Sequence, residues 1–273
     1  MTEQEKILQE YMLEQEAVSK KMFEERGAEL LGIGKTKAIG KTKEGNVLMR
    51  FLDSYTGTAG VKDGGGNEVA GYSAGLGYMN MMTSWTIFKM LNDACGIPTQ
   101  NISVDPENNI LTAKLVTLLG KGMPFQHNGK EWTSKGVEVI ARNNAVGSYL
   151  KRHPDVEKGT SLLNENGLPL IECSVKEDEA GDPIFDKNIF VGSGYVSEQD
   201  YDKVSLWTQQ ATKFLTDFFK SKDLALQDTK MEYGYTQEGI LVLADEISTG
   251  TSRIWHLDGT SAKDRDIFKA VSG

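Results

Sequence analysis

The chain has 273 residues, of which 39% are hydrophobic and 25% are charged, and its formal net charge is −9. This length and hydrophobic content suffice for one large domain or for two lobes that share a cleft. The acidic balance argues against a nucleic-acid-binding protein, which needs a basic surface, and no apolar run approaches the roughly 18 residues that span a bilayer. The N-terminal residues lack the composition of a signal peptide, so we expect a cytoplasmic protein.

The first predicted element is an amphipathic helix within residues 2–26. Ile7, Leu8 and Tyr11 recur among charged neighbours with a period near 3.6. Such a helix has one apolar face, which packs either on the body of the protein or on a partner. We therefore treat residues 1–30 as an N-terminal helical extension and as a candidate contact in a homodimer.

The next segment, "LGIGKTKAIGKT" (residues 31–42), looks like a nucleotide site because glycines beside lysines often wrap a phosphate. It is not a P-loop, since that motif needs a glycine five residues before Gly-Lys-Thr, where this chain has Glu29 and Lys35. Alternation along a strand would place Lys35 and Lys37 on one face beneath the turn at Gly34, where two ammonium groups can hold phosphate oxygens. A solvent-exposed lysine hairpin is the open alternative.

Three further segments set the predicted organisation of the first half. Short β-like runs lead into the glycine-rich residues 60–77, which we expect to form a long loop. Residues 79–95 predict a mostly apolar helix whose methionines lie in the core. The polar segment 120–136 then separates a β-rich lobe (residues 31–120) from a larger mixed lobe (residues 121–273).

The second half contains a predicted long helix at residues 198–222, with Ser197 as its N-cap. Two strands follow, "DTKMEYGY" and "GILVLADEI", joined by the turn "TQEG". Antiparallel pairing about this turn brings Glu232 within a residue or so of Asp245, and like charges placed opposite each other are unfavourable unless something offsets them. A divalent cation held by both carboxylates and by phosphate oxygens would do so. An exposed hairpin with scattered charges is the alternative. Lys230 shares the face of Glu232.

A second group of polar residues lies in "ARNNAVGSYLKRH" (residues 141–153). Arg142 ends an apolar strand, and Ser148 opens a predicted helix that carries Lys151 and Arg152. An anion bound there would meet helix N-terminal amides, a hydroxyl and nearby cations together. A basic helix start on the surface is the alternative reading.

Two shorter segments add charged residues. In "KEDEAGDP" (residues 176–183), Lys176 stands at the mouth of a turn flanked by Asp178 and Asp182, and turn chemistry alone accounts for most of this pattern. In "STGTSRIW", Arg253 follows Asp245 by eight residues, which is near enough to reach the same cleft. A single arginine near a tryptophan usually packs on it, so this residue alone indicates little.

Taken in chain order, these segments resemble SAICAR synthetase, the phosphoribosylaminoimidazole-succinocarboxamide synthase of purine biosynthesis. The resemblance runs from about residue 31 to the end of the chain. It implies an α+β fold of two lobes, with ATP bound in the cleft between them. The matching segments are "GKTKAI", "FLDSYT", "IFKMLNDACGIPT", "VEVIARNNAVGS", "KRHPDVEKGT", "KEDEAGDP", "DTKMEYG", and "LADEIS" followed by "SRIW".

The resemblance also implies a reaction. The family uses ATP and Mg²⁺ to join the carboxylate of carboxyaminoimidazole ribonucleotide to the amine of L-aspartate, through an acyl phosphate. Magnesium and lysines would neutralise charge on the migrating phosphoryl group. The residues that match the family's motifs are Gly34, Lys35 and Lys37 for ATP, Glu232 and Asp245 for Mg²⁺, Arg142, Ser148, Lys151, Lys176 and Arg253 for substrate, and Lys230 and Asp182 for catalysis.

The chain also departs from the family pattern. Residues 55–63 lack the usual Phe-Asn-Gly, residues 76–82 replace polar groups by leucine and methionines, residues 248–250 read Ser-Thr-Gly in place of Ser-Pro-Asp, and residues 120–136 look inserted. Two alternatives therefore stay open. One is a relative that acts on a different carboxylated heterocyclic nucleotide or amine, and the other is a nucleotide-binding protein without catalysis. Retention of Lys35 and of the Glu232 and Asp245 pair speaks against the second.

Overall fold

The computed structural model describes residues 2–58, 61–63 and 68–273. The N-terminal helix α1 (Glu3–Glu24) begins with a capping box, in which the Thr2 side chain accepts from the backbone N–H of Glu5 and the Glu5 side chain accepts from the backbone N–H of Thr2. Its inward face carries the fully buried Phe23. The predicted amphipathic helix is therefore confirmed, and it packs on the body of the protein.

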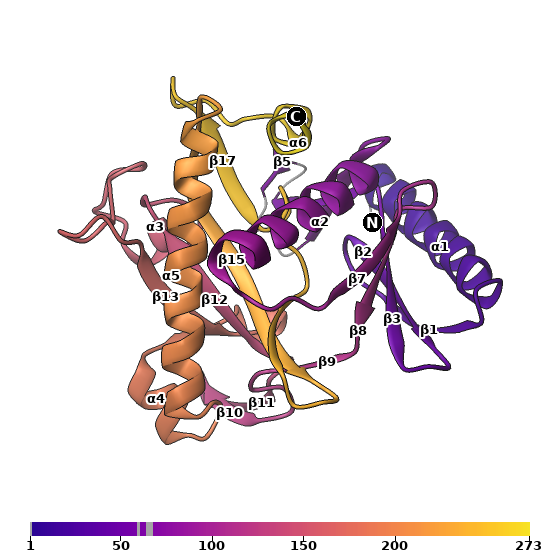
Figure 1. Ribbon diagram of the computed structural model, residues 1–273, viewed down its shortest axis with the longest axis horizontal. Helices are drawn as coiled ribbons and strands as arrows, with labels where there is room; N and C mark the ends of the chain where they lie inside the picture. Colours follow the sequence, from indigo (N-terminus) through magenta and orange to yellow (C-terminus); the bar gives the residue numbers. More distant parts are fainter. Residues whose placement is uncertain (1, 59–60, 64–67) are drawn as a thin grey trace.

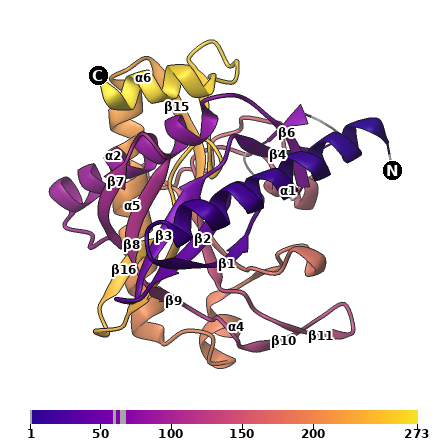
Figure 2. The same ribbon diagram turned by 90° about the vertical axis from the view of Figure 1, so that its right-hand side faces the viewer.

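The first lobe contains a five-stranded antiparallel sheet that lies between two helices, with α1 on one face and α2 (Leu76–Cys95) on the other (Figure 2). Alternation along the central strand explains both contacts, because Val47 and Met49 pack in the cluster beneath α2 whereas Leu48 packs with Phe23 of α1. The strand order is β1 (Ala28–Ile33), β2 (Lys37–Thr42), β3 (Asn46–Phe51), β8 (Ile110–Lys114) and β7 (Asn101–Asp105).

Beside this sheet lies a small antiparallel sheet of β4 (Ser54–Thr58), β5 (Val61–Lys62) and β6 (Glu68–Tyr72). The prediction of a loop over residues 60–77 is wrong for β5 and β6, and residues 60 and 64–67 lie outside the described part of the chain. The reason is that two glycines allow close strand contact instead of a loop. A Cβ at Gly57 would lie 2.0 Å from the Val61 carbonyl oxygen, and one at Gly71 would lie 2.3 Å from the Tyr55 hydroxyl.

The second lobe is built on a seven-stranded sheet that the long helix α5 (Glu198–Lys220) covers on one face (Figure 1). Ser197 caps α5 by accepting from the backbone N–H of Asp200, as predicted. The apolar side chains of the sheet point toward α5 and form the main core. The strands are β9 (Val116–Leu118), β12 (Val137–Arg142), β13 (Leu170–Val175), β14 (Ile184–Phe185), β15 (Leu224–Thr236), β16 (Leu241–Ala244) and β17 (Ser252–His256).

The segment predicted as a polar connection contains a hairpin of β10 (Pro124–His127) and β11 (Lys130–Thr133). Its turn residues Asn128 and Gly129 have φ of 51° and 74°, which is the left-handed geometry that a two-residue hairpin turn requires. The remaining helices are α3 (Ser148–Arg152), α4 (Lys187–Gly192), α6 (Asp264–Ser272) and the 3₁₀ turn η1 (Asp178–Ala180). In the part of the chain that the structure describes, no helix is long and apolar enough to cross a membrane.

Candidate active site

A cavity of about 1130 Å³ opens onto the turn that precedes β2, the small β4–β6 sheet and the polar face of the large sheet. It exceeds the roughly 300–1,000 Å³ that one drug-sized ligand occupies, so it has room for more than one substrate. All the predicted site residues except Glu232 line it. They are Gly34, Lys35, Lys37, Arg142, Ser148, Lys151, Lys176, Asp182, Lys230, Asp245 and Arg253.

The period of two along three strands places these groups. On β12, Val139 and Ala141 are buried on the apolar side, whereas Glu138 and Arg142 line the cavity. Strand register then aligns the polar rows, since Glu138 pairs with Glu232 of β15 and Arg142 pairs with Asp228. The cleft face of the sheet is thus a set of charged rows, and the opposite face is core.

The first charged row sets two buried acids beside each other, which would be unfavourable without counter-charges. The Lys230 ammonium group lies 2.7 Å from Glu138 and 3.8 Å from Glu232. The Lys176 ammonium group lies 2.6 Å from Glu232 and 3.9 Å from Glu138. The burial of Lys230 would lower its pKa, but the Glu138 and Glu232 carboxylates outweigh burial and hold the pKa above its ordinary value.

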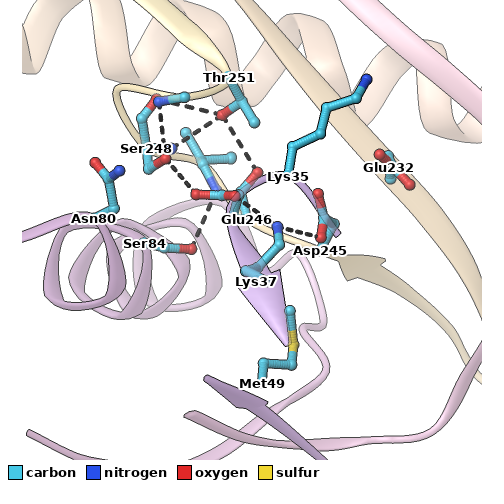
Figure 3. A network of polar contacts seen from close by, with 12 residues as sticks. Lys35, Lys37, Met49, Asn80, Ser84, Glu232, Asp245, Glu246, Ser248 and Thr251 are labelled. Atoms are coloured by element: carbon cyan, nitrogen blue, oxygen red, sulfur yellow. Dashed lines mark hydrogen bonds and ion pairs between the residues drawn. The ribbon is translucent and has the colours of Figure 1, made fainter. Parts of the chain in front are cut away.

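The next strand end brings in Asp245, which follows β16 with a left-handed φ of 60°. Figure 3 shows Lys37 reaching from β2 to this point, where its ammonium group lies 2.6 Å from both Asp245 and Glu246. Glu246 also accepts a hydrogen bond from the Ser248 hydroxyl. Lys37 therefore joins the two lobes directly through a buried group of charges.

The predicted closeness of Glu232 and Asp245 is confirmed by the register, because Glu232 pairs with Ala244 and Asp245 is the next residue. Burial raises the pKa of Glu232, and the Asp245 carboxylate adds to that rise. Burial would also raise the pKa of Asp245, but Lys37 and Lys176 overcome it and lower the value to about 2. Glu232 is only 2% exposed and lies behind the lysines.

Carboxylate oxygens are hard ligands, so this cluster suits Mg²⁺ chemically. With all groups ionised, the ammonium groups of Lys37, Lys176 and Lys230 face four carboxylates and leave one negative charge in excess. Among the described residues, no three histidine, cysteine or acidic side chains are grouped as a metal site. Magnesium commonly binds through one or two carboxylates with phosphates supplying the rest, and the residues present fit that mode.

The second charged row centres on Arg142, whose side chain is 1% exposed. Its guanidinium group donates to Glu172 at 2.6 Å, to Asp228 at 3.0 Å and to the Ser148 hydroxyl at 3.0 Å. Ser148 opens α3, as predicted, and Lys151 follows it on the cavity wall. The structure therefore groups the predicted anion-binding residues around one buried arginine.

Arg253 of β17 joins the same row. Its guanidinium group lies 2.7 Å from Asp228 and 2.7 Å from Asp63 of the first lobe. Gly147 makes this position possible, since a Cβ there would lie 2.5 Å from the Arg253 guanidinium atoms and the residue has a φ of +56°. The prediction that Arg253 reaches the cleft of Asp245 is confirmed.

The turn at residues 176–183 closes the other end of the cavity. The Lys35 ammonium group crosses from the first lobe to Asp178 at 2.7 Å. Asp182 has a left-handed φ of 48°, and its carboxylate accepts from the backbone N–H of Glu177 at 2.8 Å. Burial raises the pKa of Asp182 above its ordinary value, and the nearby Glu138 adds to this.

Sequence reasoning missed five acidic residues of the cavity wall among the described residues: Asp63, Glu68, Glu138, Asp228 and Glu246. Alternation in "VEVIAR" was a signal for Glu138, because that residue shares the face of Arg142. The prediction that the methionines of helix α2 lie in the core is confirmed for Met81. Leu76 and Met81 are fully buried, and none of the described residues that line the cavity belongs to α2. The methionines are core packing, and they do not favour a different substrate.

Comparison with known proteins gives a consistent result. The model of the family described as SAICAR synthetase matches residues 30–272. The phosphoribosylaminoimidazole-succinocarboxamide synthase of Finegoldia magna is 33% identical over 241 residues, which cover 88% of this chain and 91% of that protein. The protein of the same name from Methanocaldococcus jannaschii is 31% identical over 241 residues, covering 88% of this chain and 87% of its own length.

Solved structures agree. The phosphoribosylaminoimidazole-succinocarboxamide synthase of Ehrlichia chaffeensis superposes with a TM-score of 0.70 at 25% identity, covering 89% of this chain and 95% of that one. A SAICAR synthetase solved in complex with ADP superposes with a TM-score of 0.68 at 27% identity, covering 89% of this chain and 91% of that one. The predicted α+β fold is thereby confirmed.

Proposed function

The chain belongs to the SAICAR synthetase family, and from this premise we propose how its own residues carry out the family's reaction. The protein is an ATP-dependent ligase of purine biosynthesis, which joins the carboxylate of carboxyaminoimidazole ribonucleotide to the amine of L-aspartate. The roles of individual side chains, the metal and the order of steps are the proposal.

ATP lies against the turn before β2, where Lys35 and Lys37 bind its phosphate oxygens beneath Gly34. This assignment is supported by the position of both ammonium groups on one cavity wall, where each is paired with carboxylates of the opposite lobe. The phosphates compete with Asp178, Asp245 and Glu246 for these two lysines. Binding of ATP therefore exchanges ion pairs between the lobes for ion pairs to the nucleotide.

The carboxylates of Glu232 and Asp245 hold the metal. A divalent cation bound there supplies positive charge beside the phosphoryl oxygens. The excess negative charge of the cluster supports this assignment. Lys176 and Lys230 orient the Glu232 carboxylate, from which their ammonium groups lie 2.6 and 3.8 Å away.

The acceptor nucleotide lies at the other charged row. Arg142 and the Ser148 hydroxyl bind its phosphate together with Arg253 and Lys151, a combination of guanidinium, hydroxyl and helix N-terminal groups that suits a phosphate. Asp228 orients both arginines from beneath, at 3.0 and 2.7 Å. The arginine row thus holds the acceptor phosphate at a site separate from the phosphates of ATP.

A carboxylate is a poor electrophile, so the acceptor carboxylate first attacks the terminal phosphoryl group of ATP and forms an acyl phosphate, releasing ADP. Lys230, on the sheet between the two charged rows, neutralises the oxygens of the migrating group. The amine of aspartate then attacks the acyl carbon and expels phosphate. Asp182, whose pKa is raised, accepts the proton that the amine loses at its carboxylate oxygen. Lys176 contributes positive charge for the substrate carboxylates.

The single observation that carries this proposal is that one cavity brings Lys35, Lys37 and Asp245 together with the arginine row. The test is ADP release by purified protein, with ATP, Mg²⁺, L-aspartate and carboxyaminoimidazole ribonucleotide omitted one at a time. We expect release only when all four are present. Release with a different acceptor or amine, and none with these, would support the divergent relative. Binding of ATP without turnover would support a non-catalytic protein.

The proposal also covers the lobe boundaries, the cellular location and the oligomeric state. We assign the lobes to residues 31–120 and 121–273, with residues 1–30 as the extension, except that β9 (Val116–Leu118) pairs with β15 in the sheet of the second lobe. The protein acts in the cytoplasm, which suits an enzyme of nucleotide synthesis. It forms a homodimer to which the N-terminal extension contributes, and sedimentation of the protein with and without a substitution on the exposed face of α1 tests this.

A further inference from the structure

The helix α1 lies outside the match to the family, which begins at residue 30. Its second half is firmly attached to the first sheet. Phe23 is fully buried against Gly40, where an added Cβ would lie 2.7 Å from the ring. Arg50 of β3 donates to the Ser19 hydroxyl at 2.9 Å and to the Gln15 side chain at 3.0 Å. These contacts fix where the first half of α1 lies.

That first half reaches the small β4–β6 sheet, as Figure 2 shows for α1 and β6. The ring of Tyr11 stacks on Tyr72 of β6, with centroids 4.5 Å apart and planes inclined by 5°. Asp53, the residue before β4, lies near enough to Tyr11 that its charge, after burial, raises the pKa of the phenol. Because Ser54 pairs with Tyr72 in the antiparallel sheet, Asp53 and Tyr72 lie at the same end of the small sheet, and Tyr11 covers that end.

The residues that Tyr11 covers are bonded directly to the ATP-binding turn. The Ser54 hydroxyl donates to the Lys35 carbonyl at 2.6 Å. Asp53 accepts from the backbone N–H of Ser73 at 2.8 Å, and its carboxylate accepts from the backbone N–H of Gly77 at 2.8 Å. A shift of Asp53 and Ser54 would thus move the backbone that carries Lys35.

We propose that Tyr11 is a positioning residue for ATP binding, which acts by holding Tyr72 and the Asp53–Ser54 segment and, through Ser54, the Lys35 turn. This inference rests on the proposed role of Lys35 in binding ATP. Tyr11 touches no part of the cavity itself. The stack of Tyr11 on Tyr72 is half-exposed and is small beside the buried core around Phe23. Removal of the Tyr11 ring therefore changes the turn that carries Lys35 and leaves the fold intact.

The test compares Tyr11→Ala with Tyr11→Phe, which keeps the ring, and with Leu13→Ala on the exposed side of the same helix, where Leu13 is 60% exposed. Affinity for a non-hydrolysable ATP analogue with Mg²⁺ is measured by calorimetry, together with KM for ATP, kcat and Tm. We expect Tyr11→Ala to weaken nucleotide binding by about three- to tenfold, as loss of an aromatic pair implies. Its KM for ATP rises in parallel. Tyr11→Phe keeps the ring but lacks the hydroxyl near Asp53, so it should lose less affinity than Tyr11→Ala, while Leu13→Ala and the Tm of all three variants stay at wild-type values.

Tyr72→Ala removes the other ring of the stack and provides a second route if Tyr11→Ala fails to fold. It should weaken nucleotide binding to the same degree, and the double variant should be no worse than either single one. Wild-type affinity in both single variants would overturn the inference, as would an equal loss in Tyr11→Phe. If wild-type protein fails to bind the analogue, the proposed function fails instead.

Discussion

Replacing Arg142 with methionine tests the charged row at the acceptor end of the cavity. The Arg142 side chain is 1% exposed and contacts Glu172 at 2.6 Å and Asp228 at 3.0 Å. Removing one partner of a buried ion pair usually costs about 3–5 kcal/mol, because the remaining charge is left buried without a counter-charge. Here Glu172 keeps Arg152 at 2.6 Å and Asp228 keeps Arg253 at 2.7 Å. We therefore expect the lower end, about 3 kcal/mol.

Urea unfolding measures this loss, and Arg152→Met is the matched control. The Arg152 side chain is 34% exposed and bonded to the same Glu172, so its removal should cost less than about 1 kcal/mol. The Arg142→Met protein should also lose affinity for the acceptor nucleotide and keep its affinity for an ATP analogue. Equal losses of stability in the two variants, or a loss below about 1 kcal/mol for Arg142→Met, would refute the reasoning.

Three other changes have defined outcomes. Gly147→Ala places a Cβ 2.5 Å from the Arg253 guanidinium group at a φ of +56°, so KM for the acceptor should rise about tenfold or more in steady-state assays while KM for ATP stays constant. Asp245 has a folded pKa of about 2, below its ordinary 3.8. The ionised Asp245 therefore stabilises the fold above pH 3.8, and this stabilisation is lost as the pH falls toward 2. Across that window the unfolding free energy of the Asp245→Asn protein should fall by about 2 kcal/mol less than that of wild type. Phe23→Ala should lower the unfolding free energy by about 3–5 kcal/mol in urea, because the ring is fully buried.

Each of these has an outcome that contradicts it. An unchanged KM for the acceptor in Gly147→Ala would mean that Arg253 does not bind that substrate. If the unfolding free energies of wild type and Asp245→Asn fell equally as the pH is lowered, Lys37 and Lys176 would not stabilise the ionised form of Asp245. A change below about 1 kcal/mol in Phe23→Ala would show that α1 is not anchored in the first lobe.

Local patterns predicted the elements whose signals lie within a few residues. The helical period gave α1 and α5, and Ser197 marked the start of α5 because an N-cap acts only on its own first turn. The β10–β11 hairpin carries an equally local signal in Asn128-Gly129. The β4–β6 sheet carried no such signal, since its glycines serve close strand contact that depends on Tyr55 and Val61.

In the site, contacts between residues of one hairpin could be predicted from the sequence, whereas contacts between distant strands could not. Glu232 and Asp245 were predictable as neighbours because they share one hairpin. The acid that lies directly opposite Glu232 is Glu138, which belongs to a distant strand, and only the sheet register brings the two together. The same holds for Lys37 beside Glu246 and for Asp63 beside Arg253. Long-range pairs of this kind follow from tertiary packing, which a one-dimensional pattern does not contain.

The central claim is that Glu232 and Asp245 hold a divalent cation together with the phosphates of ATP. Its most direct test is the anomalous scattering of Mn²⁺ in crystals grown with a non-hydrolysable ATP analogue. We predict one peak bonded to carboxylate oxygens of both residues and to phosphate oxygens, with Lys35 and Lys37 turned to the nucleotide. A nucleotide complex in which Mn²⁺ contacts neither carboxylate, and in which Lys37 and Lys176 keep their ion pairs, would contradict it.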